Sequence, residues 1–279
     1  MRTHERMTEN PNKNAIVATV TSGKGGVGKT FFTVNLAASL AARGRKVLVV
    51  DCDLGLANVD IMLGLHPRLS LKDVLFGSAL PEDVILPTKA GFDLLPACSG
   101  VREMAQLLFE KIQIVKGVLS SLEGYDVMLL DTGAGIAETV LQFNLLALRN
   151  IVVLNRELTS ITDSYAMMKV MHQIFGRDTF SLVVNAVADE REGERIFHHV
   201  DGICRRFLGF GTDYLGLIFR DEAVPKSILR QEPLVLAGPG SKTAACFDRI
   251  ADAVCRWEKP LPRVQSPPGP ERGARGILH

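Results

Sequence analysis

The chain has little excess charge of either sign, no cysteine pair at Cys-x-x-Cys spacing and no long hydrophobic stretch. Its 279 residues include 32 Lys and Arg against 31 Asp and Glu, and a net charge of +1 excludes bulk electrostatic binding to nucleic acid. The longest apolar run, 145–154, is interrupted by Arg149 and Asn150, so it is too short to span a bilayer. With 47% hydrophobic and 23% charged residues, global disorder is excluded as well.

Cysteine usage and the N-terminal sequence bear on the cellular compartment. The first fourteen residues are polar and do not have the pattern of a signal peptide. We therefore expect a reduced, cytoplasmic protein in which each cysteine is a small core-filling residue. Peripheral attachment at the inner face of the plasma membrane stays open. The five cysteines are Cys52, Cys98, Cys204, Cys246 and Cys255.

Short apolar segments rich in β-branched residues alternate with segments of helical length. Several of these apolar segments show no polar alternation, which is typical of strands that are buried on both faces. The repeated strand–helix order predicts a single α/β domain with a mainly parallel, twisted sheet of seven or eight strands and helices on both faces. The expected strands are 15–20, 46–50, 93–95, 127–130, 151–154, 182–184 and 215–218, and the expected helices are 30–43, 101–108, 112–122, 137–148, 159–175, 189–207 and 241–257.

The domain is expected to occupy residues 14–257. Residues 1–13 and the Pro/Gly-rich residues 258–279 are predicted to be disordered tails, because neither has a composition that sustains regular structure. Both tails are net basic, which leaves the domain between them slightly acidic. In the last expected helix, the apolar residues recur at helical spacing and predict a face that docks on the core. These residues are Phe247, Ile250, Val254 and Trp257.

The strongest local signal is Gly23-Lys-Gly-Gly-Val-Gly-Lys-Thr30, which fits the pattern G-x-x-x-x-G-K-[ST] and lies between an expected strand and an expected helix. Glycines let such a loop turn its backbone N–H groups toward phosphate oxygens, and the helix N-terminus adds partial positive charge. Lys29 should reach the β- and γ-phosphates, and the Thr30 hydroxyl should bind Mg²⁺. The predicted nucleotide-binding residues are therefore Gly23, Lys24, Gly25, Gly26, Val27, Gly28, Lys29 and Thr30.

Three aspartates follow expected strands. Asp51 and Asp53 come after the second strand, and Asp131 ends the segment 127–131, as in a Walker B strand. Because the carboxyl ends of parallel strands meet at one edge of the sheet, these carboxylates should lie near the phosphate loop. One of the first pair can order magnesium waters and the other can orient an attacking water, while Asp131 should hold Mg²⁺. The Gly-containing turn 132–136 is suited to sensing a γ-phosphate.

Lys24 is the second residue of the loop 23–30. With a lysine at this position, the loop resembles the deviant Walker A motif of the MinD/ParA class of P-loop ATPases. Segments 51–64, 95–100, 131–136 and 157–169 resemble the FlhG (FleN or YlxH) branch of that class, whose members control the number and placement of flagella. The resemblance covers about residues 15–257. It implies a cytoplasmic molecular switch that hydrolyses ATP slowly to ADP and phosphate with Mg²⁺, and that forms a homodimer with ATP. It also implies a protein partner such as an FlhF-like GTPase or a flagellar basal-body or regulatory protein.

The resemblance also implies roles for individual residues. Lys24 would cross the dimer interface to the partner's nucleotide, and Asp53 would activate water, so Asp53, Lys24 and Lys29 form the catalytic set. Asp51, Asp131 and Thr30 would hold magnesium. Asn185, at the end of an expected strand, would read the nucleotide base; initiation of a turn is the less favoured alternative for an asparagine there. Glu157 and Asp163 match positions at the dimer and partner surface.

The sequence departs from the family pattern in several places. Arg156 and Phe219 replace prolines, and Phe31-Phe32 replaces small or polar residues. The first fourteen residues have no Asp-Gln-Ala-type motif that stimulates FlhF, and the C-terminal tail offers no obvious amphipathic helix. Membrane attachment is therefore expected to be weak or indirect.

Two other functions stay open: a MinD-type division-site regulator at the membrane, and a ParA-type DNA segregation ATPase. DNA binding is the less favoured, because the domain is slightly acidic and its arginines are better explained as a solvated face. Those arginines are Arg205, Arg206, Arg220, Arg230 and Arg249.

Overall fold

The computed structural model describes residues 15–53, 58–97 and 109–257. The expected disordered tails, 1–13 and 258–279, lie outside the described residues, as do the expected helix 101–108 and Cys98.

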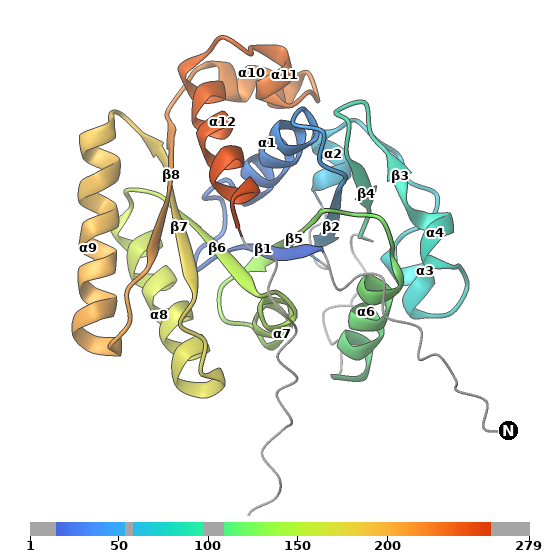
Figure 1. Cartoon of the computed structure of the whole chain (residues 1–279), viewed down its shortest axis with the longest axis horizontal. Coiled ribbons are helices and arrows are strands. Elements are labelled where there is room, and N and C mark those ends of the chain that lie inside the picture. The colour runs from blue at the N-terminus through green and yellow to red at the C-terminus, as the bar shows by residue number, and fades with distance from the viewer. Residues whose placement is uncertain (1–14, 54–57, 98–108, 258–279) are drawn as a thin grey trace, which may run out of the picture.

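One eight-stranded sheet forms the centre of the molecule, with strand order β3-β4-β2-β5-β1-β6-β7-β8 (Figure 1). All neighbouring strands are parallel except β3, which pairs antiparallel with β4 at one edge. The prediction of a mainly parallel sheet of seven or eight strands is confirmed. The strands are β1 (Ile16–Ser22), β2 (Val47–Cys52), β3 (Leu86–Pro87), β4 (Asp93–Leu95), β5 (Val127–Ala134), β6 (Arg149–Leu154), β7 (Phe180–Val187) and β8 (Asp213–Phe219).

The central strands are buried on both faces. Every residue of β2 is buried, and the first six residues of β5 are buried as well. Continuous burial explains why these segments are uniformly apolar rather than alternating, since helices cover both sides of a parallel sheet.

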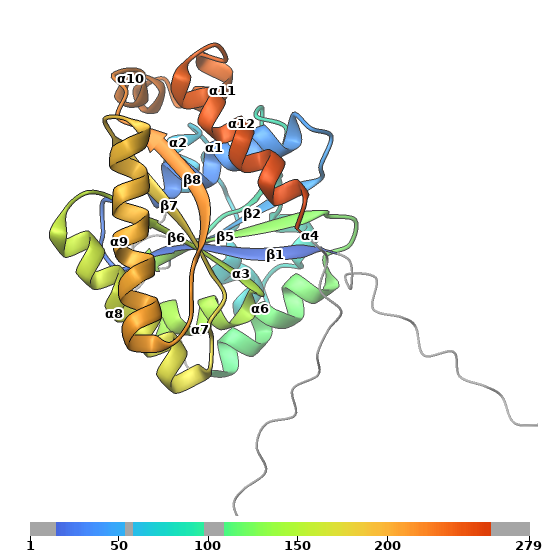
Figure 2. The same ribbon diagram turned by 60° about the vertical axis from the view of Figure 1, so that its left-hand side comes forward.

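The helices form a layer on each side of the sheet (Figures 1 and 2). Helices α1 and α12 pack together on one face, whereas α6, α7 and α8 lie on the other, and α9 packs on β7 and β8. The helices are α1 (Lys29–Ala41), α2 (Val59–Met62), α3 (Leu71–Leu75), α4 (Pro81–Val84), α6 (Phe109–Ser121), α7 (Glu138–Leu146), α8 (Leu158–Phe175), α9 (Glu190–Leu208), α10 (Ala223–Leu229), α11 (Leu234–Ala237) and α12 (Lys242–Cys255).

Capping residues in the sequence fix the ends of the long helices. The side chain of Asp189 accepts a hydrogen bond from the backbone of Glu192 at the start of α9, and the Ser241 side chain accepts one from Ala244 at the start of α12. Helix α9 then ends at Gly209 in the left-handed conformation, where glycine has no Cβ penalty. These local signals explain why the expected bounds of α9 and α12 are close to the observed ones.

The departure at Phe31-Phe32 is accommodated by the core between α1 and α12. Both rings lie 5.8 Å, centroid to centroid, from the ring of Phe247, which is fully buried. Ile250 and Val254 are buried beside it, so the predicted docking face is confirmed for these three residues. The fourth, Trp257, lies beyond the end of α12 and is part-buried. Large apolar residues after the phosphate loop therefore serve to attach the C-terminal helix to α1.

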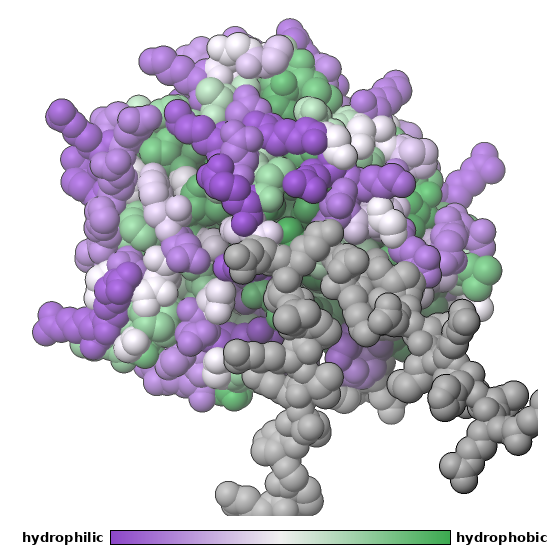
Figure 3. Space-filling view, in the orientation of Figure 1, coloured by the Kyte–Doolittle hydropathy of each residue, from purple (hydrophilic) through white to green (hydrophobic). Residues whose placement is uncertain are grey.

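The face of the molecule in Figure 3 is mostly hydrophilic, with hydrophobic residues in scattered patches between the polar ones. Within residues 15–53, 58–97 and 109–257, every helix is too short or too polar to cross a membrane. Four cysteines are described; three are buried, Cys255 is part-buried, and all four are free.

Candidate functional site

The phosphate loop lies between β1 and α1 and has glycine where the packing requires it. At Gly28, whose φ is +96°, a Cβ atom would lie 2.4 Å from Nδ2 of Asn185. At Gly23, a Cβ atom would lie 2.0 Å from the carbonyl carbon of Asp163 in α8. The loop is thus pressed against β7 on one side and α8 on the other, which fixes its position.

A cavity of about 920 Å³ opens in front of this loop. Lys29 and Thr30 line it together with Asp53. Gly133 and Ala134 also line it, and they lie at the end of β5, which continues beyond the strand end expected at 130 into the segment expected as a turn. Its other walls are largely apolar and come from α2, α7 and the segment around α10. These wall residues include Ile61, Met62, Val140, Ile228, Leu229 and Gln231.

A second hollow, of about 1040 Å³, lies between the loops after β7 and β8 and helix α12. It is lined by charges of both signs, including Asp189, Arg220 and Lys242, and by no residue of the phosphate loop. Although it is slightly larger, only the first cavity brings phosphate-binding groups and carboxylates together.

Asp131 joins the Walker B strand to helix α1. Its Oδ2 accepts a hydrogen bond from the Thr30 hydroxyl at 2.7 Å, and its Oδ1 accepts one from the Thr33 hydroxyl at 2.9 Å. Burial raises the pKa of this carboxyl to about 6, although these hydroxyls and the charge of Lys29 work in the opposite direction. The carboxylate is thus held in place beside the hydroxyl that is expected to bind Mg²⁺.

Asp51 is buried on the neighbouring strand, where it is paired with Asp131 in the β2–β5 register. Its carboxylate accepts hydrogen bonds from the backbone N–H groups of Asp53 at 3.0 Å and of Asn58 and Val59, both at 3.2 Å. Burial and the charge of Asp131 raise its pKa well above the ordinary value despite these bonds. Asp53, in contrast, reaches the cavity itself.

Lys29 is buried at the start of α1. Burial lowers the pKa of its ammonium group, and the nearby carboxylates of Asp131 and Asp53 partly offset this effect. A cation so poorly hydrated interacts strongly with any anion that enters the cavity. This is the environment that a phosphate-binding lysine requires.

The oxygen donors at this edge suit Mg²⁺. The ion is usually held by one or two carboxylates together with water and substrate phosphates, and here a hydroxyl and two fixed carboxylates lie beside the loop. Thr30, Asp51 and Asp131 would hold it, either directly or through water. When bound, the ion would neutralise phosphate charge.

Asn185 contacts the phosphate loop. Its Nδ2 donates to the carbonyl oxygen of Val27 at 2.7 Å, and its Oδ1 accepts from the N–H of Ala186 at 2.9 Å. The second contact joins neighbouring residues of β7, which continues to Val187, so Asn185 does not initiate a turn here. The side chain thus supports the loop, and its role in reading a base stays a prediction.

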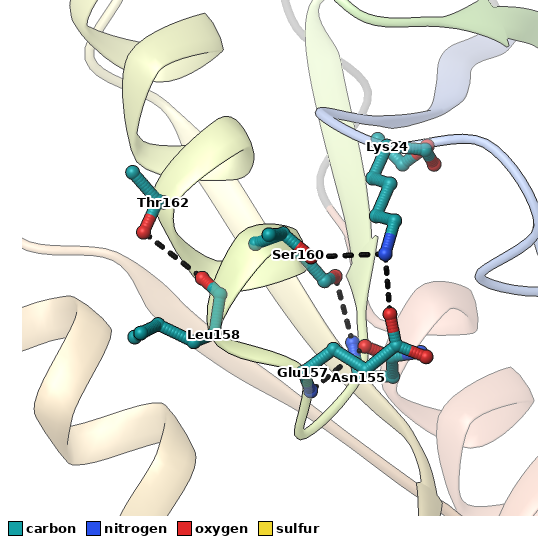
Figure 4. A network of polar contacts seen from close by, with 8 residues as sticks. Lys24, Asn155, Glu157, Leu158, Ser160 and Thr162 are labelled. Carbon is teal, nitrogen blue, oxygen red and sulfur yellow. Dashed lines mark hydrogen bonds and ion pairs between the residues drawn. The ribbon is translucent and has the colours of Figure 1, made fainter.

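Lys24 points away from its own loop toward the N-terminus of α8 (Figure 4). Its Nζ forms an ion pair with Glu157 and donates a hydrogen bond to the Thr159 hydroxyl at 2.9 Å. Two residues assigned to a dimer surface are thus joined within one chain. Asp163 is an exposed residue of the same helix, and its backbone lies against Gly23.

Sequence reasoning missed several residues that shape this site. Thr33 lies one helical turn beyond Thr30, so its spacing alone could have indicated a shared face toward Asp131. Thr159 and Ser164, whose hydroxyl accepts a 3.4 Å hydrogen bond from the Gly23 N–H, could not be assigned because their contacts join distant segments. No local sequence pattern indicated the apolar residues that form the cavity walls either.

Comparison with known proteins agrees with this geometry. Residues 18–234 match the family model described as the CobQ/CobB/MinD/ParA nucleotide binding domain. The chain belongs to this family. The prediction of a MinD/ParA-class P-loop ATPase is therefore confirmed.

Individual relatives support the predicted branch. The chain is 38% identical over 247 residues to the antiactivator FleN of Pseudomonas aeruginosa, covering 88% of each protein. It is 31% identical to the flagellum site-determining protein YlxH of Helicobacter pylori, covering 83% of this chain and 79% of that one. Among solved structures, the septum site-determining protein MinD of Pyrococcus horikoshii, complexed with Mg-ADP, matches with a TM-score of 0.74 and 29% identity over 87% of this chain and 96% of that one.

Proposed function

We propose that the protein is an ATP-driven dimerising switch of the FlhG type, which regulates the number and placement of flagella. The observation that carries this proposal is the cavity in which Lys29, Thr30 and Asp53 meet, beside the buried Asp131. The similarity to FleN and YlxH over most of the chain supports the flagellar role.

The site residues divide the chemistry among them. Backbone N–H groups of the loop and Lys29 bind the phosphates and stabilise the charge that develops on the γ-phosphoryl group. Asp53, which also lines the cavity, orients the attacking water. Thr30, Asp51 and Asp131 hold Mg²⁺, which suits the chemistry of their oxygen donors.

Dimerisation with ATP would give Lys24 a new contact. In the single chain its ammonium group is bound to Glu157 and Thr159 at the start of α8. In the proposed dimer it leaves them and reaches the nucleotide of the second copy. Hydrolysis then reverses the exchange and releases the protein partner, for which an FlhF-like GTPase or a flagellar basal-body protein is our proposal.

Substitution of Asp53 tests the proposal. Asp53→Ala should bind ATP with Mg²⁺ but hydrolyse it at least about tenfold more slowly, a barrier increase of about 1.4 kcal/mol, because the phosphate-binding groups stay in place. It should also accumulate as an ATP-bound dimer. Single-turnover hydrolysis and sizing with ATP measure both effects, with the melting temperature as a folding control.

Lys29→Ala is the matched comparison, because it should lose ATP binding itself. Equal ATP affinity of wild type and Lys29→Ala in calorimetry would contradict the phosphate-loop assignment. Normal turnover by a destabilised Asp53→Ala would instead assign Asp53 a purely structural role.

A MinD-type division regulator is the second candidate, favoured by the match to MinD structures. It would require direct attachment at the membrane, whereas we place the protein in the cytoplasm with weak or partner-dependent attachment. ATP-dependent pelleting with anionic liposomes would favour the MinD type. An ATP-dependent shift of non-specific DNA would favour a ParA-type function.

A further inference from the structure

Gln231, between α10 and α11, has a backbone conformation that is unfavourable for its residue type. Its φ is +54°, and among the described residues only Ala186 also combines a side chain with a positive φ. The left-handed conformation ends helix α10, because the N–H groups of Gln231 and Glu232 donate to the carbonyl oxygens of Ile228 and Ser227. Glycine is the usual residue at such a position, so the presence of glutamine needs an explanation from its side chain.

The side chain of Gln231 is bound to α2, 170 residues away in the sequence. Its Nε2 donates to the carbonyl oxygen of Ile61 at 3.0 Å. Its amide also lies against Gly64, where a Cβ atom would approach Oε1 of Gln231 to 2.6 Å. Gly64 itself has a φ of +63°. Gly64 and Gln231 are the left-handed residues that end α2 and α10, and the Gln231 amide lies against the C-terminal end of α2.

The other end of α2 is bound to a predicted magnesium ligand. The N–H groups of Asn58 and Val59 both donate to Oδ2 of Asp51 at 3.2 Å. A helix of four residues is too short to be stable without external contacts. Helix α2 is held at its start by Asp51 and at its end by Gln231, and its first residue, Val59, is fully buried in the core.

We propose that Gln231 is a positioning residue for the nucleotide site: by anchoring the end of α2, it keeps the N–H groups of Asn58 and Val59 on Asp51 and so holds this carboxylate in the orientation that Mg²⁺ requires. This proposal rests on the proposed function, because it concerns the magnesium bound with the nucleotide. It explains why a strained glutamine occupies a position that glycine would fill without cost.

Gln231→Gly is the informative variant, because the proposal predicts that it needs more Mg²⁺ for activity without being less stable than wild type. Glycine relieves the backbone strain, so the melting temperature should be unchanged or higher. Loss of the hydrogen bond should nevertheless raise the Mg²⁺ concentration for half-maximal ATP hydrolysis by about threefold or more. Gln173→Ala, an exposed glutamine at the end of α8, is the control and should change neither quantity.

Hydrogen exchange supplies a second readout that needs neither nucleotide nor metal. In the free protein, amides of residues 58–65 should exchange faster in Gln231→Gly than in wild type, because α2 opens more often. Gly64→Ala, which displaces the Gln231 amide, should raise the Mg²⁺ requirement more in wild type than in the Gln231→Gly background, where only the backbone strain at φ +63° remains.

Wild-type exchange together with wild-type Mg²⁺ dependence in Gln231→Gly would overturn the proposal. So would faster exchange without a change in Mg²⁺ dependence, since α2 would then not act through Asp51. If the wild-type protein itself hydrolysed no ATP, the proposed function would fail, and this inference with it. If wild type hydrolyses ATP but Gln231→Gly shows none of the expected changes, this inference fails and the proposed function stands.

Discussion

At the scale of single residues, the candidate site contains buried ionisable groups whose charged forms reduce the stability of the folded protein. Burial raises the pKa of Asp131 to about 6 and that of Asp51 well above its ordinary value, while it lowers the pKa of Lys29. Each shift means that the folded protein disfavours the charged form. Groups of this kind concentrate where a ligand must be bound, and they reduce the stability of the ligand-free protein.

Asp131→Asn should therefore stabilise the nucleotide-free protein increasingly as the pH rises. The folded pKa of Asp131 lies above the ordinary value of 3.8, so its stabilising contribution is complete below that value and is lost as the pH rises through about 6. Between about pH 4.5 and 8, the difference in unfolding free energy between variant and wild type should grow by about 2 kcal/mol. Urea unfolding at the two pH values measures it.

Gln173→Ala, at an exposed glutamine with no titratable group, is the control and should not alter the pH dependence. A constant difference for Asp131→Asn across the range would show that the buried carboxyl does not titrate as inferred. The variant should also bind Mg²⁺-ATP more weakly, which separates the gain in stability from the loss of function.

Single residues differ in how far the sequence predicts them. The loop 23–30 follows a local spacing that is typical of phosphate binding, and its predicted position between a strand and a helix is confirmed. Thr159 and Gln231 have no such pattern, because their partners, Lys24 and Ile61, are more than 130 residues away. Contacts of this kind depend on the packing of whole elements.

At the scale of elements, the phosphate loop packs so closely against α8 that no space remains for a side chain at Gly23. Gly23→Ala would place a Cβ atom 2.0 Å from the carbonyl carbon of Asp163, so the loop or the helix must move. We expect a loss of about 1–3 kcal/mol in stability, typical of overpacking, together with weaker ATP binding. Thermal unfolding and calorimetry measure the two effects.

Gly25→Ala is the matched stability control, because a Cβ atom there meets no other atom within 4 Å. It should leave the melting temperature close to that of wild type. Equal destabilisation by the two substitutions would mean that loop flexibility, rather than the contact with α8, decides the effect.

The elements also show where prediction from sequence stops. The long helices and the buried strands were expected at nearly their observed positions because their periodicity and caps are local. Helices α2 and α10, of four and seven residues, are too short to show a period, and neither was expected. These short helices supply apolar walls of the cavity, so the surroundings of the site were less predictable than its chemistry.

At the scale of the whole molecule, the Lys24–Glu157 ion pair competes with dimerisation if the proposed switch is correct. Both side chains are partly exposed, so the pair is weak and can be exchanged for a contact with a second copy. Lys24→Ala should bind ATP as a monomer and should not dimerise or hydrolyse it. Sedimentation velocity with ATP and Mg²⁺ measures the oligomeric state, and calorimetry measures binding.

Glu157→Gln tests the competition from the other side. Removing the carboxylate charge frees Lys24 in the single chain, so the concentration needed for ATP-dependent dimerisation should fall by about two- to fivefold, in line with the modest strength of exposed ion pairs. Thr162→Ala, on the exposed first turns of α8, is the control and should have no effect on assembly. If Glu157 instead acts across the dimer interface, Glu157→Gln should dimerise less readily than wild type. Because the two mechanisms shift the dimerisation constant in opposite directions, one sedimentation series with ATP distinguishes release of an intrachain contact from loss of an interface contact.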